Sequence, residues 1–476
     1  MQSAANNAAL RWFGPALAIV LAVTVFRLVL LAFDRTDLFV DETQYWIWGQ
    51  RLDFGYYSKP PLIGWVIRLV TELAGSDTPF WVRMPGAVFH AATALILAAL
   101  AARIGGRGAA IWTAALYVTL PFVGVGTVLI STDTIMAPFF AAALLFFWRC
   151  GDDRRAVFAL AAGACIGAAF MAKYAAIYFL IGAGLAMAVV PGRRIGWGNV
   201  AWLLLAFLLV IAPNVIWNLT HKLATVEHTM DNVGWVRGGA GLNLSSMAAF
   251  FGSQFGVFGP VAMVALLLGY SRKGADARAL ALLSVTPLVA VTVQALLGKA
   301  YANWAVAAYF AGTVLAVLVL PRWGRWLALG LNLLVTVAIP VLTVLAPWPD
   351  VGGKPLLNRY LGREQLSERI LALARANDVP IYADDRDILA DLFYTGREVG
   401  VTIYAPRAHG RPRNYYEQNF ALPDGFKGPI LVIRRAPLDC GAGAVPPAGI
   451  LNPAGVWMGR QITPYLVDGD CLAAQS

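Results

Sequence analysis

One polar segment of the chain holds residues whose types and spacing suit chemistry on a sugar phosphate. Asp41 and Glu42 are adjacent carboxylates, and Lys59 stands just before two prolines that fix its backbone. A carboxylate can take a proton from a reacting hydroxyl, and an ammonium group held in place can face a phosphate. Three aromatic residues follow the acids at helical spacing and can stack on a sugar: Tyr45, Trp46 and Trp48. Ordinary acids of a solvated loop are the simpler alternative.

Residues of the same kinds recur at three later turns of the chain. Asp133 ends the sequence Ser-Thr-Asp, and Lys173 precedes a tyrosine. The third turn contains Lys299, Tyr301, Asn303 and Trp304. Each turn also has a simpler interpretation. Ser-Thr-Asp before an apolar run is a helix N-cap signal, lysines at helix ends snorkel, and Tyr and Trp gather at membrane interfaces.

The elements that must position these residues are membrane spans. Of the 476 residues, 59% are hydrophobic and 13% are charged, whereas a typical soluble domain has about 25% charged residues. A soluble protein of this length cannot bury so much apolar surface. The composition therefore excludes a cytosolic enzyme, a disordered scaffold and a disulfide-stapled secreted fold, and it predicts a polytopic membrane protein.

Apolar stretches predict eleven membrane spans, each compatible with the ~17–25 residues needed to cross a bilayer. They cover residues 15–33, 84–102, 108–127, 134–149, 156–171, 174–190, 197–217, 246–270, 279–297, 300–320 and 323–346. Two longer polar segments, residues 34–80 and 218–245, connect some of them. The aromatic spacing after Asp41 predicts interfacial helices in the first of these segments.

Basic residues in the short loops set the expected orientation. One set of loops, from Arg11 to Arg325, is rich in arginine, whereas the opposing short loops carry little beyond Lys173 and Lys299. The positive-inside rule makes the first set cytoplasmic. The N-terminus is then cytoplasmic, and an odd number of spans places the C-terminal tail outside. The net charge of +10 is explained in this way without a nucleic-acid partner.

The tail differs in composition from the rest of the chain. We expect an all-α membrane domain over residues 1–349 and a small α/β extracytoplasmic domain over residues 350–476. Apolar spacing predicts a helix over 361–377, and short apolar runs predict strands near 381–382, 401–404 and 430–433. Cys440 and Cys471 lie in this tail and can pair if the compartment is oxidising.

The polar motifs, taken in order along the chain, resemble those of a known family. The matching points are Asp41-Glu42 with Tyr45, then Tyr56 with Lys59-Pro60-Pro61, then Ser131-Thr132-Asp133, Lys173-Tyr174 and Tyr301-Ala302-Asn303-Trp304. Over residues 10–345 the chain resembles membrane glycosyltransferases of the GT-C type. It is most similar to the group that holds bacterial lipid A aminoarabinose transferases and to the wider protein O-mannosyltransferase superfamily.

The resemblance implies a donor whose sugar is carried on a polyprenyl phosphate. Asp41 would be the general base that deprotonates the acceptor, with Glu42 as the second catalytic acid, which shapes the site. The leaving phosphate needs cations, because its negative charge grows during the reaction. The expected phosphate-binding residues are Lys59, Lys173, Lys299 and Tyr301. The expected sugar and acceptor contacts are Tyr45, Tyr56, Tyr57, Asp133, Asn303 and Trp304, and Asp133 is also a candidate to hold Lys59.

No cofactor is required by these motifs, and a divalent metal has little support. His221 and His228, with an acid between them, are candidate zinc ligands, but their spacing matches no standard set. In the aminoarabinose transferases a glutamate usually precedes the motif lysine and can serve a metal. Ser58 stands at that place here. This departure weakens both a metal site and aminoarabinose as the sugar.

The sequence predicts an enzyme of the bacterial inner membrane that transfers a sugar by a single inverting displacement. Its partners would be a polyprenyl-phosphate-linked sugar, membrane lipids, and an acceptor such as lipid A, lipopolysaccharide core or another envelope lipid or glycan. A lipid or solute transporter or flippase is the alternative. Transporters usually place ionisable residues near the bilayer midplane, whereas here the candidate residues gather at one face. A purely structural protein would leave the recurring acids and lysines unexplained.

Overall fold

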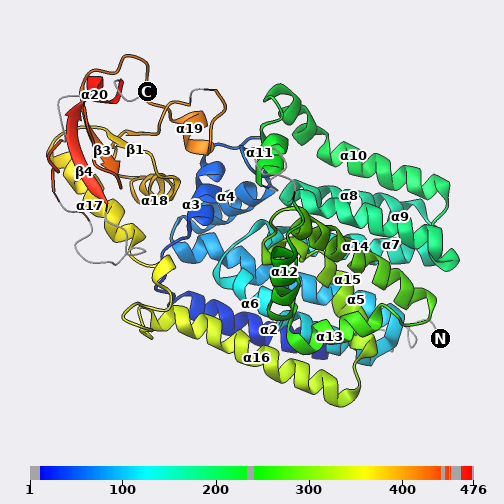
Figure 1. The fold of residues 1–476 in the computed structure, drawn as a ribbon. Coiled ribbons are helices and arrows are strands. Elements are labelled where there is room, and N and C mark those ends of the chain that lie inside the picture. Colours follow the sequence, from blue (N-terminus) through cyan, green and yellow to red (C-terminus); the bar gives the residue numbers. More distant parts are fainter. Residues whose placement is uncertain are drawn as a thin grey trace.

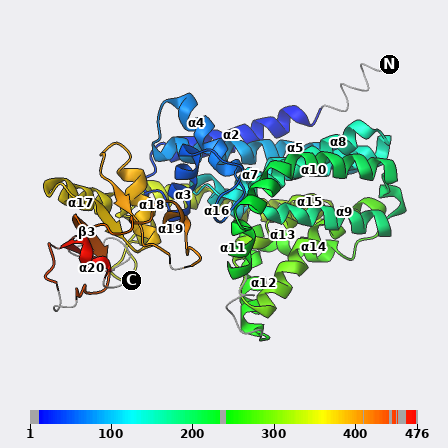
Figure 2. The ribbon, with the colours of Figure 1, turned by 90° about the horizontal axis from the view of Figure 1, so that it is seen from above.

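The chain folds into a helical membrane part and a smaller mixed part near its C-terminal end (Figure 1). The structure is a computed structural model and describes residues 11–232, 241–408, 410–440, 445–449, 451 and 462–473. Both ribbon views show the two parts side by side, with short helices of the first loop between them (Figure 2). The predicted helical, multi-pass fold is confirmed, whereas the boundary after residue 349 stays a prediction.

The membrane part consists of helices joined mostly by short turns. They are α2 (Phe13–Leu31), α3 (Val40–Gln50), α4 (Leu62–Ala74), α5 (Pro79–Val118), α6 (Pro121–Val128), α7 (Thr132–Asp153), α8 (Ala156–Ala172), η1 (Tyr174–Ala176), α9 (Ile177–Val189), η2 (Pro191–Arg193), α10 (Trp197–Thr220), α11 (Ala224–Asn232), α12 (Leu244–Phe258), α13 (Pro260–Gly269), α14 (Ala275–Leu297), η3 (Ala302–Ala305), α15 (Ala308–Val319) and α16 (Arg322–Leu345).

Among the described residues, six helices are long and apolar enough to cross a membrane: α2, α5, α7, α10, α14 and α16. A seventh span results if α12 and α13, which meet at a bend of 110°, count as one. Three apolar helices are shorter and cover Ala156–Ala172, Tyr174–Val189 and Ala308–Val319. The chain is thus a multi-pass membrane protein, and the number of eleven spans stays a prediction.

Two glycines break helices that the apolar pattern alone would continue. Gly106 has a φ of 71° inside α5, which separates the stretches expected as spans 84–102 and 108–127. Gly259 has a φ of 87° and separates α12 from α13, with Pro260 as the first residue of α13. The side chain of Asn332 fills the space where a Cβ of Gly259 would lie. Positive φ suits glycine because it has no Cβ, so hydropathy does not reveal these breaks.

Small residues bring α8 and α10 close together. Gly163 and Gly167 lie one helical turn apart on α8 and face α10. A Cβ on Gly163 would collide with the carbonyl oxygen of Leu203, and one on Gly167 would lie 2.7 Å from the Cβ of Val210. Small residues at this spacing let backbones of membrane helices approach closely. The packing of this helix pair therefore depends on the absence of two side chains.

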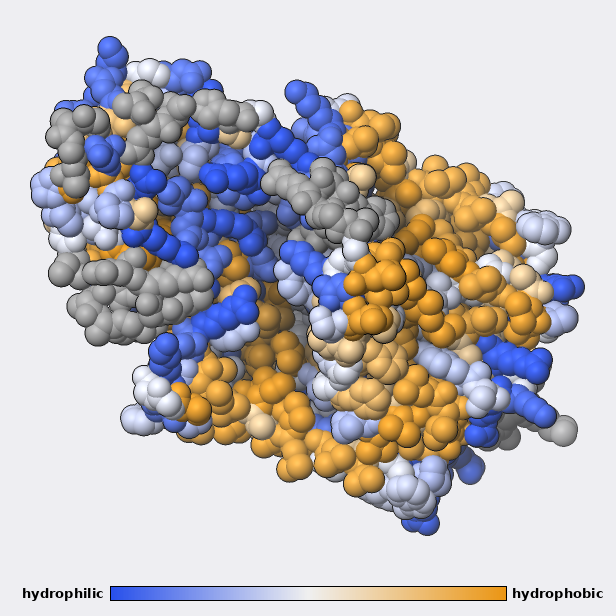
Figure 3. Space-filling model, viewed as in Figure 1, coloured by the Kyte–Doolittle hydropathy of each residue, from blue (hydrophilic) through white to orange (hydrophobic). Residues whose placement is uncertain are grey.

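The surface of the molecule is divided into an apolar and a polar region. In Figure 3 the orange residues cover much of the helix bundle, whereas blue residues dominate the tail. Leu209 on α10 and Leu334 on α16 are 66% and 67% exposed, as lipid-facing residues would be. The bundle also carries a network of ion pairs. In this network Arg193 pairs with Asp152 and Asp276, and Arg103 pairs with Asp152 as well.

Two helices, α3 and α4, occupy the first polar segment, where the sequence predicted helices. They pack closely because Gly49 and Gly64 face each other, so that a Cβ on Gly49 would lie 2.9 Å from the carbonyl oxygen of Gly64. Gly75, with a φ of 62°, ends α4. Figure 1 shows α3 between the membrane bundle and the tail. This position lets α3 contribute side chains to both.

The tail contains a four-stranded sheet in the order β2-β1-β3-β4. Its elements are η4 (Asn358–Tyr360), α17 (Arg363–Ala376), β1 (Ile381–Ala383), α18 (Arg386–Thr395), β2 (Ile403–Tyr404), α19 (Tyr415–Asn419), β3 (Pro429–Arg434), β4 (Thr463–Asp468) and α20 (Gly469–Ala473). Strand β1 is parallel to β2 and β3, and β4 is antiparallel to β3. The apolar runs near 381, 403 and 430 are strands, and β4 is a strand that the sequence analysis missed.

Hydrogen bonds and ring contacts fasten the tail to the first polar segment. The Tyr394 hydroxyl donates to the carbonyl oxygen of Asp77 over 2.5 Å, and its ring packs edge-on against Trp46. The Tyr57 hydroxyl donates to the carbonyl oxygen of Pro412 over 2.8 Å. The backbone N–H of Arg363 donates to a carboxylate oxygen of Asp37 over 2.6 Å. The tail is therefore held against the residues that surround Asp41.

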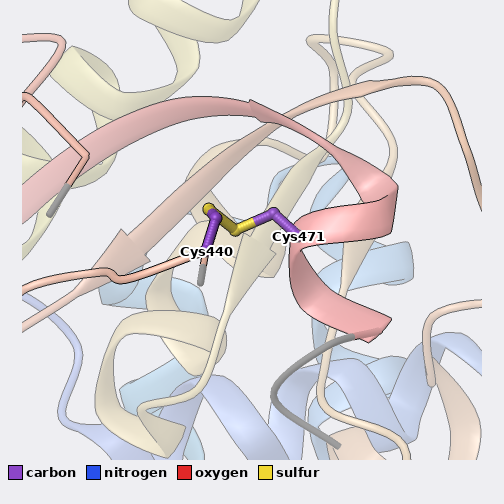
Figure 4. Close-up of a disulfide and its surroundings, with 2 residues drawn as sticks. All are labelled: Cys440 and Cys471. Carbon is purple, nitrogen blue, oxygen red and sulfur yellow. A yellow bond between two sulfur atoms is a disulfide. The ribbon is translucent and has the colours of Figure 1, made fainter. Parts of the chain in front are cut away.

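The two cysteines of the tail, Cys440 and Cys471, form a disulfide (Figure 4). It joins the segment after β3 to helix α20, which follows β4. The pairing that the sequence allowed is thus found in the structure. Cys150 and Cys165 are free.

Candidate active site

A cavity of about 750 Å³ lies where the membrane helices, the first polar segment and the tail meet. The predicted residues that line it are Asp41, Glu42, Tyr45, Tyr57, Lys59, Asp133, Lys173, His228, Tyr301, Asn303 and Trp304. Its apolar side is formed by Pro121, Phe122, Val125, Leu129, Val257 and Val306, mostly from α6 and the end of α12. The cavity thus offers charged groups next to an apolar wall.

Glu42 is completely buried, and both of its oxygens are occupied. It is the third residue of α3, and its Oε2 accepts the backbone N–H of Phe39 over 2.9 Å, which closes the start of the helix. Its Oε1 accepts the backbone N–H of Ile130 over 2.9 Å, and Arg83 donates to both oxygens. A carboxylate offers about four acceptor positions. Glu42 therefore shapes the site and has no position left for a reactant.

Arg83, in the first turns of α5, is the partner of Glu42 and is 1% exposed. Its Nη2 lies 2.7 Å from Glu42 Oε2, and its Nη1 lies 3.2 Å from an oxygen of Asp34. It also donates to the carbonyl oxygens of Thr36 and Asp37. One guanidinium thus fixes the chain before α3 and α3 itself against α5. Charge-assisted forks of this kind are the strongest polar contacts in proteins.

Asp41 directly precedes Glu42 in the chain, but its side chain is partly exposed whereas that of Glu42 is buried. Its side chain is 48% exposed and lines the cavity. Its Oδ1 accepts a hydrogen bond of 2.5 Å from Nη2 of Arg386, the first residue of α18 in the tail. Nε of Arg386 donates to Gln44 over 3.0 Å. Burial lowers the pKa of Arg386, but the charge of Asp41 and its hydrogen bond outweigh this effect, so the pKa of Arg386 is raised.

Asp133 and Lys173 form the second ion pair of the cavity. Ser131 caps α7 by accepting the N–H of Thr134, which places Asp133 in the first helical turn. Nζ of Lys173 lies 2.7 Å from each oxygen of Asp133, and Asn303 donates to one of them over 3.0 Å. Asp133 therefore holds Lys173 and not Lys59 as we expected. The N-cap and the cavity interpretations of this motif both apply.

Lys59 is an unpaired cation of the cavity. It lies in the loop between α3 and α4, where its carbonyl oxygen accepts the N–H of Tyr56 over 3.2 Å. Its ammonium group makes no ion pair or hydrogen bond with any residue that the structure describes. Burial lowers the pKa of Lys59, the neighbouring charge of Lys173 lowers it further, and Asp41 and Asp133 partly oppose both effects. A lysine kept without a partner beside two carboxylates is suited to bind an anion.

The predicted aromatic residues divide into two groups. Tyr45, Tyr57, Tyr301 and Trp304 line the cavity. Tyr56 does not, because its ring stacks on Trp48 with 4.8 Å between the centroids, and its hydroxyl donates to the carbonyl oxygens of Trp48 and Arg51. Tyr56 thus lies outside the cavity lining in this structure, and its expected contact with sugar stays a prediction. Tyr56 instead holds the loop that carries Lys59.

Two further predicted residues lie outside the cavity. Lys299 is exposed, with its ammonium 5.7 Å from the centroid of the Tyr301 ring, and its expected place at the donor phosphate stays a prediction. His221 stacks on Trp217 with 4.2 Å between the ring centroids, whereas His228 lines the cavity beside Tyr57. Burial lowers the pKa of His228 to about 4, so it is neutral at pH 7. Within the described residues no group of three or more possible metal ligands is found.

The sequence analysis missed the arginines that complete the site. Arg83 stands just before the apolar run expected as span 84–102, and an arginine at such a place is a signal for a buried ion pair. Arg359, Arg386 and Arg413 line the cavity from the tail. They lie more than 300 residues from Asp41, so no local pattern could connect them to it.

We predict that Arg83→Met lowers the free energy of unfolding by about 3–5 kcal/mol, because it leaves Glu42 buried without its cation. Thermal unfolding of the purified protein in detergent measures this. Arg103→Met is the matched control, since its pair with Asp152 is 36% and 35% exposed and should matter little. The double variant Arg83→Met/Glu42→Gln should regain part of the loss. Equal stability of both single variants would contradict the role of the buried pair.

Comparisons with known proteins show which family the chain belongs to. Residues 58–217 match the family model described as dolichyl-phosphate-mannose-protein mannosyltransferase. The chain is 40% identical over 472 residues to the lipid A galacturonosyltransferase RgtD of Rhizobium johnstonii, covering 96% of this chain and 98% of that protein.

Solved structures show the same fold. ArnT from Cupriavidus metallidurans in the apo state has a TM-score of 0.66 at 15% identity, and its complex with undecaprenyl phosphate has a TM-score of 0.63 at 16% identity. Both comparisons cover 96% of this chain and 98% of ArnT. The transporter alternative finds no support in these relatives, and the predicted enzyme class is confirmed. The chain belongs to the GT-C type of integral membrane glycosyltransferases, in the family that includes RgtD.

Proposed function

We propose that the chain transfers galacturonate from a polyprenyl phosphate to lipid A at the outer face of the bacterial inner membrane. The observation that carries this proposal is that Asp41 and the unpaired Lys59 meet in one cavity beside an apolar wall. The identity of 40% to RgtD, a lipid A galacturonosyltransferase, supports the choice of sugar and acceptor. The likeness in fold to ArnT, which has been solved with undecaprenyl phosphate, supports the class of donor.

In this proposal the donor phosphate binds at Lys59, with Lys173 nearby. Lys173 is neutralised by both oxygens of Asp133, whereas Lys59 has its whole charge available. The apolar residues from α6 and α12 accept the beginning of the polyprenyl chain. The sugar then lies among Tyr45, Tyr57 and Trp304. A binding site of this kind, apolar with a few placed polar groups, is typical for small ligands.

The reaction is a single displacement with inversion at the anomeric carbon. Asp41 takes the proton of an acceptor hydroxyl, the hydroxyl oxygen forms a bond to the anomeric carbon, and the bond from that carbon to the phosphate oxygen breaks. The electron pair goes to the phosphate, which leaves as polyprenyl phosphate. Lys59 stabilises the added negative charge. Because Lys59 supplies positive charge there, the proposal needs no resident metal.

We further propose that the tail is extracytoplasmic and the N-terminus cytoplasmic, with eleven spans between them. The charged network around Asp152 and Arg193 then faces the cytoplasm, in agreement with the positive-inside rule. The disulfide of the tail is of the kind that persists outside the cytoplasm. Figure 1 supports this orientation, because α2 begins on the side of the bundle away from the tail.

Reporter fusions test the orientation. Alkaline phosphatase fused after Ser476 should be active, and the same reporter fused within the turn after Asp153 should be inactive. A reporter that works only in the cytoplasm should give the reverse pattern. Cytoplasmic activity from the fusion after Ser476 would exclude an odd number of spans.

We predict that Asp41→Asn lowers transfer at least 100-fold, because general-base catalysis contributes about 10²–10⁴-fold. Purified protein receives polyprenyl-phosphate galacturonate and lipid A, and mass spectrometry follows the gain of one hexuronate on lipid A. Asp424→Asn, at an exposed acid of the tail, is the matched control and should keep wild-type activity. Transfer by wild type should also persist in EDTA.

Three outcomes would contradict parts of this proposal. Undiminished transfer by Asp41→Asn would exclude Asp41 as the base. Loss of activity in EDTA that a divalent ion restores would introduce a metal. A hexuronate missing from another envelope component, in cells that lack the protein, would exclude lipid A as the acceptor while keeping the enzyme class.

The lowered pKa of Lys59 predicts a pH dependence of donor binding. Only the protonated amine attracts the donor phosphate, so kcat/KM for the donor should be high below the pKa of Lys59 and should fall as the pH rises through it. The fall should begin below the pH expected for a free lysine, because burial lowers this pKa. Lys59→Arg should move the fall to higher pH, since arginine stays protonated.

Lys59→Ala provides the second measurement, because the larger arginine needs room in the loop. This variant should bind the donor weakly, and its kcat/KM should no longer fall over this pH range. Lys222→Ala, at an exposed lysine, serves as the control and should bind the donor like wild type. An unchanged alkaline fall in Lys59→Ala would remove Lys59 from the phosphate site.

A further inference from the structure

We propose that Arg386 selects an acidic donor sugar: its guanidinium leaves Asp41 to bind the sugar carboxylate, and this exchange frees Asp41 to act as the base. The inference deepens the proposed function and rests on it. It assigns a specificity role to a residue of the tail, and it links recognition of the sugar to the start of the reaction.

The position of Arg386 suits this role. It is the first residue of α18, whose N-cap Asp385 accepts the N–H of Asp387 over 2.8 Å. From there its side chain reaches the cavity and donates with Nε to Gln44 and with Nη2 to Asp41. A guanidinium presents its donors as a flat fork that matches the two oxygens of a carboxylate. Lys59, as a compact point charge, is better matched to the phosphate.

The pair of Arg386 and Asp41 is the most easily opened ion pair of the site. Its side chains are 37% and 48% exposed, and a single oxygen of Asp41 takes part. The pair of Lys173 and Asp133 is 13% and 9% exposed and uses both oxygens. Exposed pairs hold together weakly compared with buried ones. An incoming carboxylate can therefore displace Asp41 from Arg386 while the other pair stays closed.

The groups around Arg386 favour a negative sugar over a positive one. Gln44 accepts from Arg386 with its Oε1 and donates with its Nε2 to the hydroxyl of Ser58 over 3.4 Å. The carboxylate that Arg386 contacts in this corner is Asp41, which the exchange releases, whereas Gln44 and Ser58 are neutral. An ammonium sugar would compete with a cation at either Asp41 or Asp133 and would be repelled by Arg386, whereas a uronate matches the fork of Arg386. The two negative charges of such a donor then meet two separate cations, Arg386 and Lys59.

The other arginines of the cavity are less suited to this role. Nε of Arg413 is 2.8 Å from Glu417, whose side chain is 1% exposed, so opening that pair would leave a buried acid alone. The guanidinium of Arg359 lies 4.8 Å from the centroid of the Phe39 ring. Asp387 lines the cavity next to Arg386 and lies 3.9 Å from Arg363. Arg386 is the arginine that contacts the proposed base directly.

The exchange predicts a particular kinetic signature. With a uronate donor, Arg386 binds the carboxylate and Asp41 becomes free to take the proton of the acceptor. With the corresponding neutral hexose, Arg386 stays on Asp41 and the base remains occupied. Interactions made only on the way to the transition state change kcat, whereas uniform binding changes KM. Replacement of the carboxylate should therefore lower kcat as well as raise KM.

The test compares two donors, polyprenyl-phosphate galacturonate and polyprenyl-phosphate galactose, which carries a CH₂OH group in place of the carboxylate. Wild type should prefer the uronate on the order of 100-fold in kcat/KM, because galactose leaves Asp41 paired with Arg386, and general-base catalysis contributes about 10²–10⁴-fold. Arg386→Gln should lose most of this preference, because the uronate loses its partner while galactose meets an Asp41 that no arginine occupies and reacts faster than in wild type. Arg386→Lys keeps the positive charge but not the flat fork of donors. Its preference for the uronate should lie between those of wild type and Arg386→Gln.

Arg407→Gln, at an exposed arginine of the tail outside the cavity lining, is the matched comparison and should keep the preference for the uronate. Equal losses with both donors in Arg386→Gln and Arg386→Lys would overturn the inference, because Arg386 would then only position Asp41. A preference that disappears in Arg407→Gln instead would overturn it as well. If wild type transfers some other sugar and not galacturonate, the proposed function itself fails, so the two failures are distinguishable.

Discussion

The buried pair of Glu42 and Arg83 is the contact on which the site depends. It fixes the start of α3 to α5, and through the N–H of Ile130 it also fixes the segment that leads into α7. Asp41 and Asp133 lie on these two elements. A carboxylate and a guanidinium that are buried away from water stay charged only if they pair with each other. The position of both cavity acids therefore follows from one pair that itself touches no reactant.

The types of the residues predicted much of the site, because the chemistry of a site allows only a few residue types. Asp41, Lys59, Asp133 and Lys173 are charges in a chain that otherwise avoids charge, and each stands at a turn between apolar stretches. The cavity brings all four together. The sequence did not predict which charged residues form ion pairs, because Asp133 could pair with either Lys59 or Lys173. That choice depends on how α7 and the end of α8 pack, and hydropathy does not encode it.

Other features could not be predicted for definite physical reasons. The helix breaks at Gly106 and Gly259 come from backbone angles, and glycine is also common in unbroken membrane helices. Tyr56 carries the same signal as Tyr57, yet its ring stacks on Trp48 and turns away from the cavity. Arg386 lies 345 residues from Asp41, and tertiary packing of the tail alone brings them together. Strand β4 has a weak apolar pattern and is specified mainly by its pairing with β3.

The order of synthesis gives the contact between Asp41 and Arg386 a further consequence. Arg386 leaves the ribosome after the last membrane helix, α16, has been made. The cavity is therefore incomplete while the spans are being inserted, and it closes only when the tail has folded against α3. A nascent or truncated chain would hold Asp41 without its arginine. The fold thus couples the completion of the site to the folding of the segment that follows α16.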